Sequence, residues 1–410
     1  MGVIYANKKA VEEYFASPAL NQSKLKDLEQ DPSLLLEEVQ EEKKSTAFLI
    51  GKGVDVLLLS PKGEYEETYY VSKLEKMPSD AMIRIIKNVV EKKREAYYNH
   101  FLVQNLSEVS VVDAVLVKEK EEVIISEENI FNLEVSLPDF KDFCGRFANP
   151  DNRIDILSAC EQENWNPKWG GEARYNNILK EGAEYFNDLV ESEGKVVLSA
   201  QEDGLIKKVA NSLRTHHRTA FLFDVSYFEN SEVFDIYYQL PIYFTYRGVA
   251  CKALLDIVLV EKDVITKEIK KVFPYDLKTM SGNTINFDGN VRSFRYDRQS
   301  AFYDEALFNH LGFDALNPEE ALKIQPFQFV VESTTKVGKP LIYKCSRELL
   351  EIGKKGITTY KKFLGIEELV DLYSYHVKNG FDEEKIIKEA AGEPLLLGWD
   401  KIQDSDGFKV

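Results

Sequence analysis

The sequence predicts an α/β fold in which helices flank a mixed sheet of four or five strands. The first observation is a change of period. From Glu232 to residue 280 apolar and polar residues alternate, as in VFDIYYQLPIYFTY, and short turns separate the runs. The second is the helical spacing of apolar residues outside this stretch, for example in residues 47–60 and 82–101. Strands and helices in this order favour a sheet that helices cover.

An apolar helix is predicted over residues 47–60, where AFLIGKGVDVLLLS ends at Pro61. Gly51 and Gly53 permit another element to approach this helix closely. Asp55 is the only acid in the apolar run. A buried carboxylate without a partner would become neutral, so a nearby cation is the favoured explanation for Asp55.

Residues 77–195 are expected to form a variable, mostly helical insertion, in which residues 82–101 make an amphipathic helix. Trp165 and Trp169 are interpreted as packing residues rather than as base-stacking ones. The pattern divides the chain into N-terminal helices with the apolar helix (1–76), the insertion (77–195), the core sheet with the helix that follows it (196–365), and a C-terminal tail (366–410).

Two predicted strands carry aspartates in apolar surroundings. Asp256 follows Ala-Leu-Leu on one strand, and Asp276-Leu277-Lys278 lies on the next. Because side chains alternate along a strand, Asp276 and Lys278 project to the same side. Two aspartates that are brought together repel each other, and Mg2+ or Mn2+ resolves this with hard oxygen ligands. With a lysine that orients or deprotonates a water, the set predicts metal-assisted hydrolysis of a phosphodiester.

The following helix places Gln299 and Tyr303 on one face, four residues apart. Aspartate, a hairpin, Asp-Leu-Lys and then Gln-x-x-x-Tyr together resemble the PD-(D/E)XK nuclease superfamily. They are most similar to its RecB-type and phage exonuclease VIII-like (RecE-type) branch. PFQFVVES at 326–333 resembles the next strand of exonuclease VIII-like proteins. The resemblance covers roughly residues 20–75 and 195–365.

The resemblance implies a restriction-endonuclease-like core and a Mg2+-dependent deoxyribonuclease in which Mn2+ substitutes. It further implies an exonuclease that resects double-stranded DNA ends in phage recombination. Such a protein works beside a single-strand annealing recombinase and often forms a ring-shaped homo-oligomer. Relatives have a metal-facing histidine where this sequence has Asp55.

The expected site residues bind metal, act in catalysis or support either group. The expected metal ligands are Asp55, Asp256, Asp276 and the carbonyl of Leu277, the expected catalytic residues are Asp256, Asp276 and Lys278, and the expected supporting residues are Gln299, Tyr303 and Glu232. Gln299 and Tyr303 would hold the DNA backbone or a ligating acid.

Two other readings stay open: an endonuclease of the same fold, and a nucleic-acid-binding module whose site has decayed. Acid-x-Lys triplets also occur elsewhere, at Glu41-Glu42-Lys43 and at Glu268-Ile269-Lys270. The second triplet lies in a polar turn rather than in an apolar strand, so it is interpreted as a decoy.

Composition limits the setting. The 410 residues carry a net charge of -17, which argues against coating of nucleic acid by the whole surface but allows a local basic cleft. The four cysteines have no C-x-x-C spacing and lack the trio that holds an iron–sulfur cluster in some relatives, so we expect neither zinc nor such a cluster. Without an apolar stretch of membrane-spanning length, a cytoplasmic protein is expected.

Overall fold

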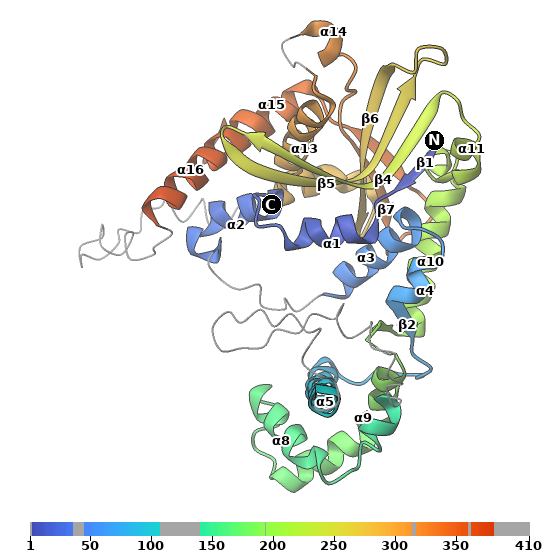
Figure 1. Cartoon of the computed structure of the whole chain (residues 1–410), viewed down its shortest axis with the longest axis vertical. Coiled ribbons are helices and arrows are strands. Elements are labelled where there is room, and N and C mark those ends of the chain that lie inside the picture. Colours follow the sequence, from blue (N-terminus) through green and yellow to red (C-terminus); the bar gives the residue numbers. More distant parts are fainter. Residues whose placement is uncertain are drawn as a thin grey trace. The chain divides into compact units, whose positions relative to one another are not determined.

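The computed structural model describes residues 2–35, 45–106, 140–192, 194–313, 317–359 and 362–380. The chain forms two compact units. One contains Met1–Tyr65 and Gly204–Val410, and the other contains Glu66–Asp203. The larger unit holds a curled mixed sheet with helices around it (Figure 1), which confirms the predicted α/β class.

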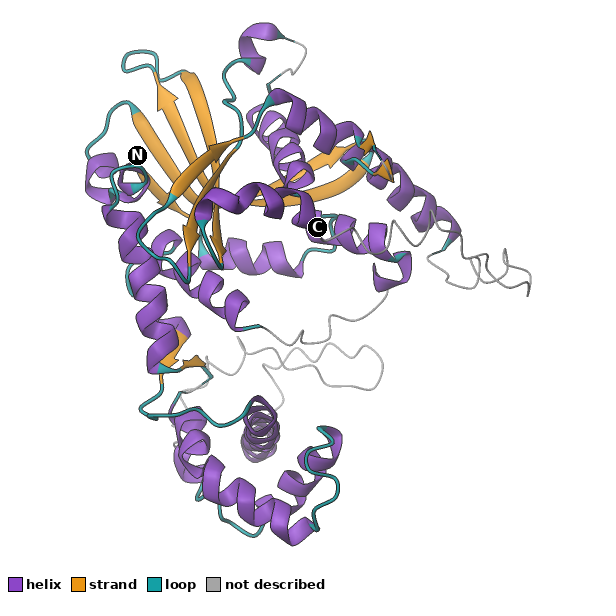
Figure 2. Ribbon diagram, turned by 180° about the vertical axis from the view of Figure 1, so that it is seen from behind, coloured by secondary structure: helices purple, strands orange, loops and turns teal. Residues whose placement is uncertain are grey.

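The sheet has six strands in the order β1-β4-β5-β6-β7-β8. They are β1 (Val3–Tyr5), β4 (Phe234–Tyr246), β5 (Val249–Lys262), β6 (Ile269–Met280), β7 (Gln328–Ser333) and β8 (Leu341–Lys344). β4, β5 and β6 are antiparallel neighbours, whereas β1 pairs with β4, and β7 with β6, in parallel. The sheet is therefore mixed, as predicted. Figure 2 shows how strongly its long strands bend.

The larger unit also contains helices, most of which pack on this sheet. They are α1 (Lys8–Ala16), α2 (Gln22–Gln30), α3 (Thr46–Leu59), α11 (Val225–Glu229), α12 (Phe287–Phe294), α13 (Tyr296–Leu311), α14 (Pro318–Ala321), α15 (Arg347–Lys355) and α16 (Ile366–Asn379). The divisions between the units fall within α4 (Glu64–Thr68) and α10 (Ala200–Thr215). Short pieces complete the unit: the 3-10 turns η1 (Pro32–Leu35), η2 (Ala220–Phe223) and η3 (Thr284–Asn286), and the ribbon of β9 (Ile357–Thr358) with β10 (Lys362–Phe363).

The apolar helix α3 begins where its sequence predicts. Ser45 caps it, accepting a hydrogen bond from the backbone N–H of Phe48 at 3.2 Å. Its two glycines fit close neighbours. A Cβ atom at Gly51 would lie 3.1 Å from Thr279 Oγ1 of β6, and one at Gly53 would lie 2.4 Å from Ile206 Cδ1 of α10. The expected close approach is therefore present on two sides of the helix.

The main core of the larger unit changes strand face at one point. On β4 the residues that meet this core are 240, 242, 244 and 246, but also Tyr237. On β5 they are 251, 253 and 255, and then 258 and 260. Both strands thus switch alternation at Gln239 and Asp256, which lie between the paired residues on either side. Gln239 has a φ of 55°, a left-handed conformation that interrupts the pleat.

Residues 366–379, which the sequence pattern places in the C-terminal tail, form α16. Ile366, Leu369 and Val370 are fully buried in the same core as β4, β5 and α13. Their apolar spacing at i, i+3 and i+4 explains the helix. The remaining part of that tail, 381–410, lies outside the described residues.

The described part of the smaller unit is mostly helical. Its helices are α5 (Asp80–Leu106), α7 (Phe140–Cys144), α8 (Asn152–Gln162) and α9 (Gly171–Glu191), and β2 (Tyr69–Val71) pairs in parallel with β3 (Val196–Leu198). Ile85, Ile86, Val89 and Val90 of the predicted amphipathic helix are buried in its core. Trp165 packs against that core and contacts Trp169 edge to face at 5.9 Å, in agreement with a packing role.

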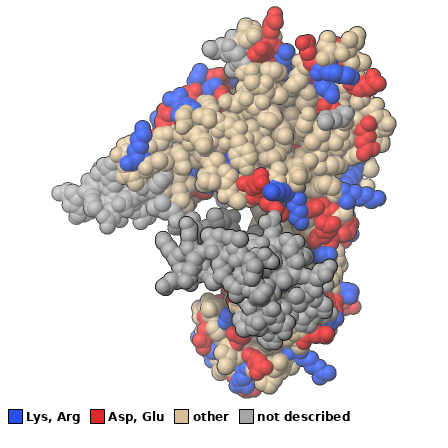
Figure 3. Space-filling view, in the orientation of Figure 1, with Lys and Arg blue, Asp and Glu red and all other residues tan. Residues whose placement is uncertain are grey.

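Charges of both signs are mixed on one face of the molecule (Figure 3). On the face drawn in Figure 3, Lys and Arg side chains are interspersed with Asp and Glu side chains rather than gathered into one basic patch. Within the described ranges, the structure contains no helix that is both long enough and apolar enough to cross a lipid bilayer.

Candidate active site

The candidate site lies where two strands separate. β5 and β6 pair antiparallel up to Ile257 and Tyr275. Beyond this pair β5 continues beside β4 but no longer beside β6, and β6 continues beside β7. Asp256 and Asp276 are the first residues past the last pair. The two aspartates therefore lie at a fork in the sheet, where backbone pairing has ended.

Hydrogen bonds hold both carboxylates at the fork. Asp276 is 2% exposed; its Oδ1 accepts a hydrogen bond from Gln299 Nε2 at 2.8 Å, and its Oδ2 lies 2.6 Å from Lys278 Nζ. Asp256 accepts one hydrogen bond from Gln239 Nε2 at 3.0 Å and another from the backbone N–H of Leu277 at 2.9 Å. The structure thus brings together Asp256, Asp276, Leu277, Lys278 and Gln299.

Helix α13 reaches the fork from one face of β6, and α3 reaches it from the other. Gln299 of α13 contacts Asp276, whereas Gly51 of α3 approaches Thr279. Residues 276 and 279 point to opposite sides of the strand because side chains alternate. Asp55 of α3 is half-buried within electrostatic range of Asp256, Asp276 and Lys278.

Two expected supporting residues have different surroundings. Tyr303 lies one helical turn after Gln299, with its ring 5.8 Å from that of Phe327. Burial, and then the charge of Asp276, raises the pKa of Tyr303 well above its usual value. Glu232 is exposed and precedes β4 by two residues. Glu232 lies seven positions before Gln239, roughly 23 Å along an extended chain, so the structure does not bring Glu232 to the fork.

Two residues at the fork were not predicted from the sequence. Gln239 contacts Asp256 from its left-handed position, and Tyr296 holds its ring 5.0 Å from Lys278 Nζ. Pro241 lies in the same strand, where proline is typical of a bulge or an edge, and the irregularity lies two residues before it. No sequence signal pointed to Tyr296, because its contact depends on how α13 meets β6.

Electrostatics at the fork favours protons on Asp276 and Asp55. Burial raises the pKa of Asp276 to about 7, with Lys278 opposing the change and the charge of Asp256 adding to it. Burial, followed by the charge of Asp256, also raises the pKa of Asp55 well above its usual value. Burial lowers the pKa of Lys278, but the charges of Asp276 and Asp256 outweigh this and raise it overall. Lys278 is therefore an ammonium ion in this arrangement.

We expect metal-free protein to lose stability as the pH rises through about 7. The folded-state pKa of Asp276 lies above its ordinary 3.8, so folding takes up a proton between these values. This contribution is full below the lower value and is lost above the higher one, on the order of 4 kcal/mol in all. Thermal unfolding in EDTA at several pH values measures it. In Asp276→Asn the dependence should be flatter, and an equally steep curve would contradict the assignment.

The donor chemistry of the fork fits a hard cation, although only in part. In the described portions of the chain, no three His, Cys, Asp or Glu side chains are grouped closely enough to hold one ion. Asp256 and Asp276 remain as a pair. Oδ2 of Asp276 is buried and, apart from the Lys278 ion pair, lacks a well-directed hydrogen bond. Since each carboxylate oxygen has two lone pairs, the pair keeps capacity for a metal.

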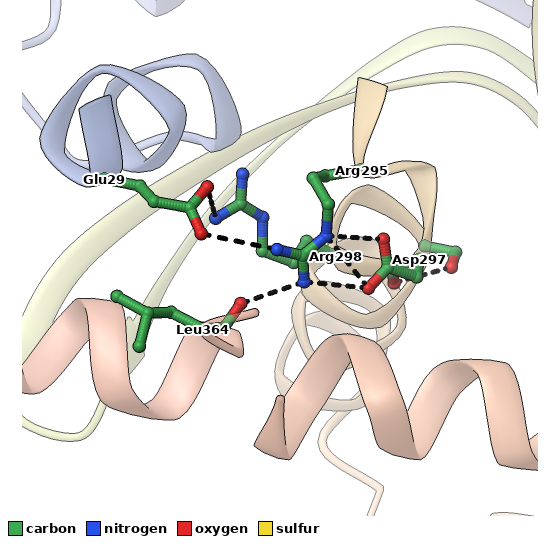
Figure 4. A network of polar contacts seen from close by, with 6 residues as sticks. Glu29, Arg295, Asp297, Arg298 and Leu364 are labelled. Carbon is green, nitrogen blue, oxygen red and sulfur yellow. Dashed lines mark hydrogen bonds and ion pairs between the residues drawn. The ribbon is translucent and has the colours of Figure 1, made fainter. Parts of the chain in front are cut away.

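A buried ionic network fixes the start of α13 (Figure 4). Arg298 is 0% exposed and pairs with Glu29 of α2 at 2.7 Å. Arg295 contacts the same Glu29 at 3.3 Å, Asp297 at 3.0 Å and the carbonyl of Leu364 at 2.9 Å. The network joins α2, α13 and the segment before α16. It therefore sets the position from which Gln299 reaches Asp276.

Glu29→Gln is expected to destabilise the larger unit by about 3 kcal/mol. The reason is that Arg298 would keep its buried charge but lose its acidic partner. In the described residues, Nε and the Nη atoms of Arg298 have no other hydrogen bond that could replace the pair. Chemical denaturation checks this. The double variant Glu29→Leu with Arg298→Met should recover most of the loss, since it removes both charges. If the double variant recovered none of the lost stability, the ion-pair explanation would be contradicted.

The decoy triplet lies away from the fork, where the turn after β5 leads into β6: Glu268 ends the turn, and Ile269 and Lys270 begin β6. Glu268 and Lys270 are exposed, and Lys270 pairs with Asp263 at 2.8 Å. The other triplet, Glu41-Glu42-Lys43, lies outside the described residues.

Replacing Glu268 and Lys270 together by alanine should change the cleavage rate by less than about 3-fold, because exposed ion pairs contribute little. DNA affinity at low salt is expected to weaken slightly. Steady-state cleavage assays of this double variant beside Asp276→Asn provide the measurement. A loss as deep as that of Asp276→Asn would mean that the motif was assigned to the wrong strand position.

Comparison with known proteins is sparse. No protein-family model matches the chain, and no curated protein matches it. Among solved structures, the chain is similar to the crystal structure of a putative exonuclease from Eubacterium rectale. The two share 15% sequence identity with a TM-score of 0.29, over 60% of this chain and 84% of that one.

Proposed function

We propose that this protein is a metal-dependent nuclease that hydrolyses phosphodiester bonds in DNA, with a core of the PD-(D/E)XK type. One observation carries the proposal: Asp256, Asp276 and Lys278 meet at the fork of β5 and β6, and Gln299 holds Asp276. Buried acids beside a lysine are costly to keep in a fold that does not use them. In this proposal the acids and the lysine act on a substrate that contains a phosphodiester group.

Asp256, Asp276 and the carbonyl of Leu277 would hold Mg2+, or Mn2+ in its place, with Asp55 as a further carboxylate. The backbone N–H of Leu277 already points at Asp256, and the N–H and C=O of one strand residue face the same side. When bound, the metal activates a water and neutralises charge at the phosphate. Its binding would release protons from the acids, so affinity should increase with pH.

Lys278 would position the attacking water and offset negative charge on the phosphate. Its raised pKa favours this role over that of a general base, since a base must first lose its proton. Gln299 would keep Asp276 turned toward the fork, and Gln239 would do the same for Asp256. Tyr296 would hold the ammonium group between its ring and Asp276.

We further propose an exonuclease that acts on double-stranded DNA ends in phage-type recombination, in the cytoplasm, with an annealing recombinase as partner and with self-assembly. Because the net charge of -17 argues against coating of DNA by the whole surface, we expect the contacts to DNA to be local.

Incubation with linear and with covalently closed circular DNA, each with Mg2+ or with EDTA, tests the proposal. Degradation of linear DNA alone, dependent on Mg2+, is the expected result. Cutting of the circle would favour an endonuclease, and binding without cleavage would favour a decayed module.

A further inference from the structure

A stack of three aromatic rings runs from the core to the surface beside the fork. Phe287 and Tyr296 lie 5.6 Å apart at 22°, and Tyr296 and Phe294 lie 5.6 Å apart at 28°. Phe287, at one end, is 1% exposed, whereas Phe294, at the other end, is 51% exposed. The stack is buried at one end and open to solvent at the other.

The middle ring of the stack touches the candidate catalytic lysine. Lys278 Nζ lies 5.0 Å from the centre of the Tyr296 ring and 2.6 Å from Asp276. Phe294 is therefore one ring away from the group that would face the reacting phosphate. A molecule lying on Phe294 would be a neighbour of that phosphate.

The backbone fixes Phe294 in this position. It ends α12, and Arg295 after it has a φ of 55°, a left-handed conformation that turns the chain into α13. The contacts of Arg295 with Glu29, Asp297 and Leu364 hold this turn. Half-exposure of a phenyl ring forgoes part of its hydrophobic stabilisation, and such a ring on a rigid turn suits a binding role.

We propose that the open face of Phe294 stacks on the base of one unpaired nucleotide next to the phosphate that is cleaved. This inference rests on the proposed nuclease function and names its substrate: a single-stranded or frayed DNA end. Bases inside a duplex are covered on both faces by their neighbours, so an unpaired base is the one with a face to offer. A phenyl ring makes no hydrogen bonds, and the contact would tolerate every base.

The test uses 2-aminopurine, whose fluorescence is quenched by stacking. Single strands carrying it at successive positions from each end are bound to the full-length Asp276→Asn protein with Mg2+, and anisotropy measures binding separately. We expect strong quenching at one position. Phe294→Ala should abolish it and weaken binding roughly 10-fold, while Phe294→Trp should retain it.

Tyr227→Ala is the matched control. Tyr227 is 53% exposed and also contacts two aromatic rings, Phe228 and Phe234, but it lies on α11 beside β1. Its removal should leave the quenching unchanged. Two results would overturn the stacking proposal alone. One is equal quenching in Phe294→Ala. The other is the absence of any quenched position, although the Asp276→Asn protein binds the DNA and the parent cleaves it. If the protein neither binds nor cleaves any DNA, the nuclease function and the stacking proposal are both overturned.

Discussion

Lys278→Ala is expected to lower the rate of DNA cleavage about 10²- to 10⁴-fold while the protein stays folded. The ammonium group lies 2.6 Å from Asp276 and 5.0 Å from the Tyr296 ring, and its side chain is 21% exposed. A cation held this way can meet a phosphate without leaving its place. Its loss would also leave the negative charges of Asp276 and Asp256 without an opposing cation.

Single-turnover cleavage of linear DNA at saturating Mg2+ measures this effect, and anisotropy with the same DNA separates binding from chemistry. Lys270→Ala is the matched control, because Lys270 also pairs with an aspartate, at 2.8 Å, but at the exposed turn that joins β5 to β6. Lys278→Arg keeps the charge and should recover only part of the rate. Parent-like cleavage by Lys278→Ala would remove Asp-Leu-Lys from the mechanism.

Asp55→Ala is expected to weaken Mn2+ binding about 10-fold or more and to slow cleavage. Asp55 approaches the fork from α3, and after burial the charge of Asp256 is the main cause of its raised pKa. Bound metal would offset that repulsion, and removal of Asp55 leaves fewer oxygen ligands. Asp55→His replaces a carboxylate by imidazole, so we expect partial activity with Mn2+.

Calorimetric titration with Mn2+ decides this, with Asp235→Asn as control. Asp235 is 5% exposed and pairs with Lys262 on the same sheet, so its change alters a buried acid that is not at the fork. Metal affinity should be unchanged in the control. If Asp55→Ala binds Mn2+ and cleaves as the parent does, Asp55 belongs to the packing of α3 rather than to the site.

The local pattern predicted those parts of the site that the backbone period determines. Asp276 and Lys278 are two residues apart on a strand, so they had to share a side, and their ion pair follows. Gln299 and Tyr303 are four apart on a helix and share a face in the same way. The antiparallel neighbours β4, β5 and β6 were predictable too, since long alternating runs joined by short turns favour hairpins.

The tertiary structure decided the contacts that span long separations in the chain. Asp55 reaches the fork because Gly51 lets α3 approach Thr279, more than 200 residues later. Gln239 contacts Asp256 because one residue adopts φ 55°, and nothing in its neighbours required that. Glu232 was expected to support the site from the start of its strand, but it lies two residues before β4 and distant from the fork along the chain.

The sequence alone therefore determined which residues share a strand or helix face in this protein, because a repeat of two or 3.6 residues orients every side chain near it. Only the tertiary structure decided where β5 and β6 part, which leaves Asp256 and Asp276 at a gap. It also decided that Glu29 meets Arg298, which sets α13 over that gap. These features depend on packing across the whole core, which no short stretch of the sequence determines.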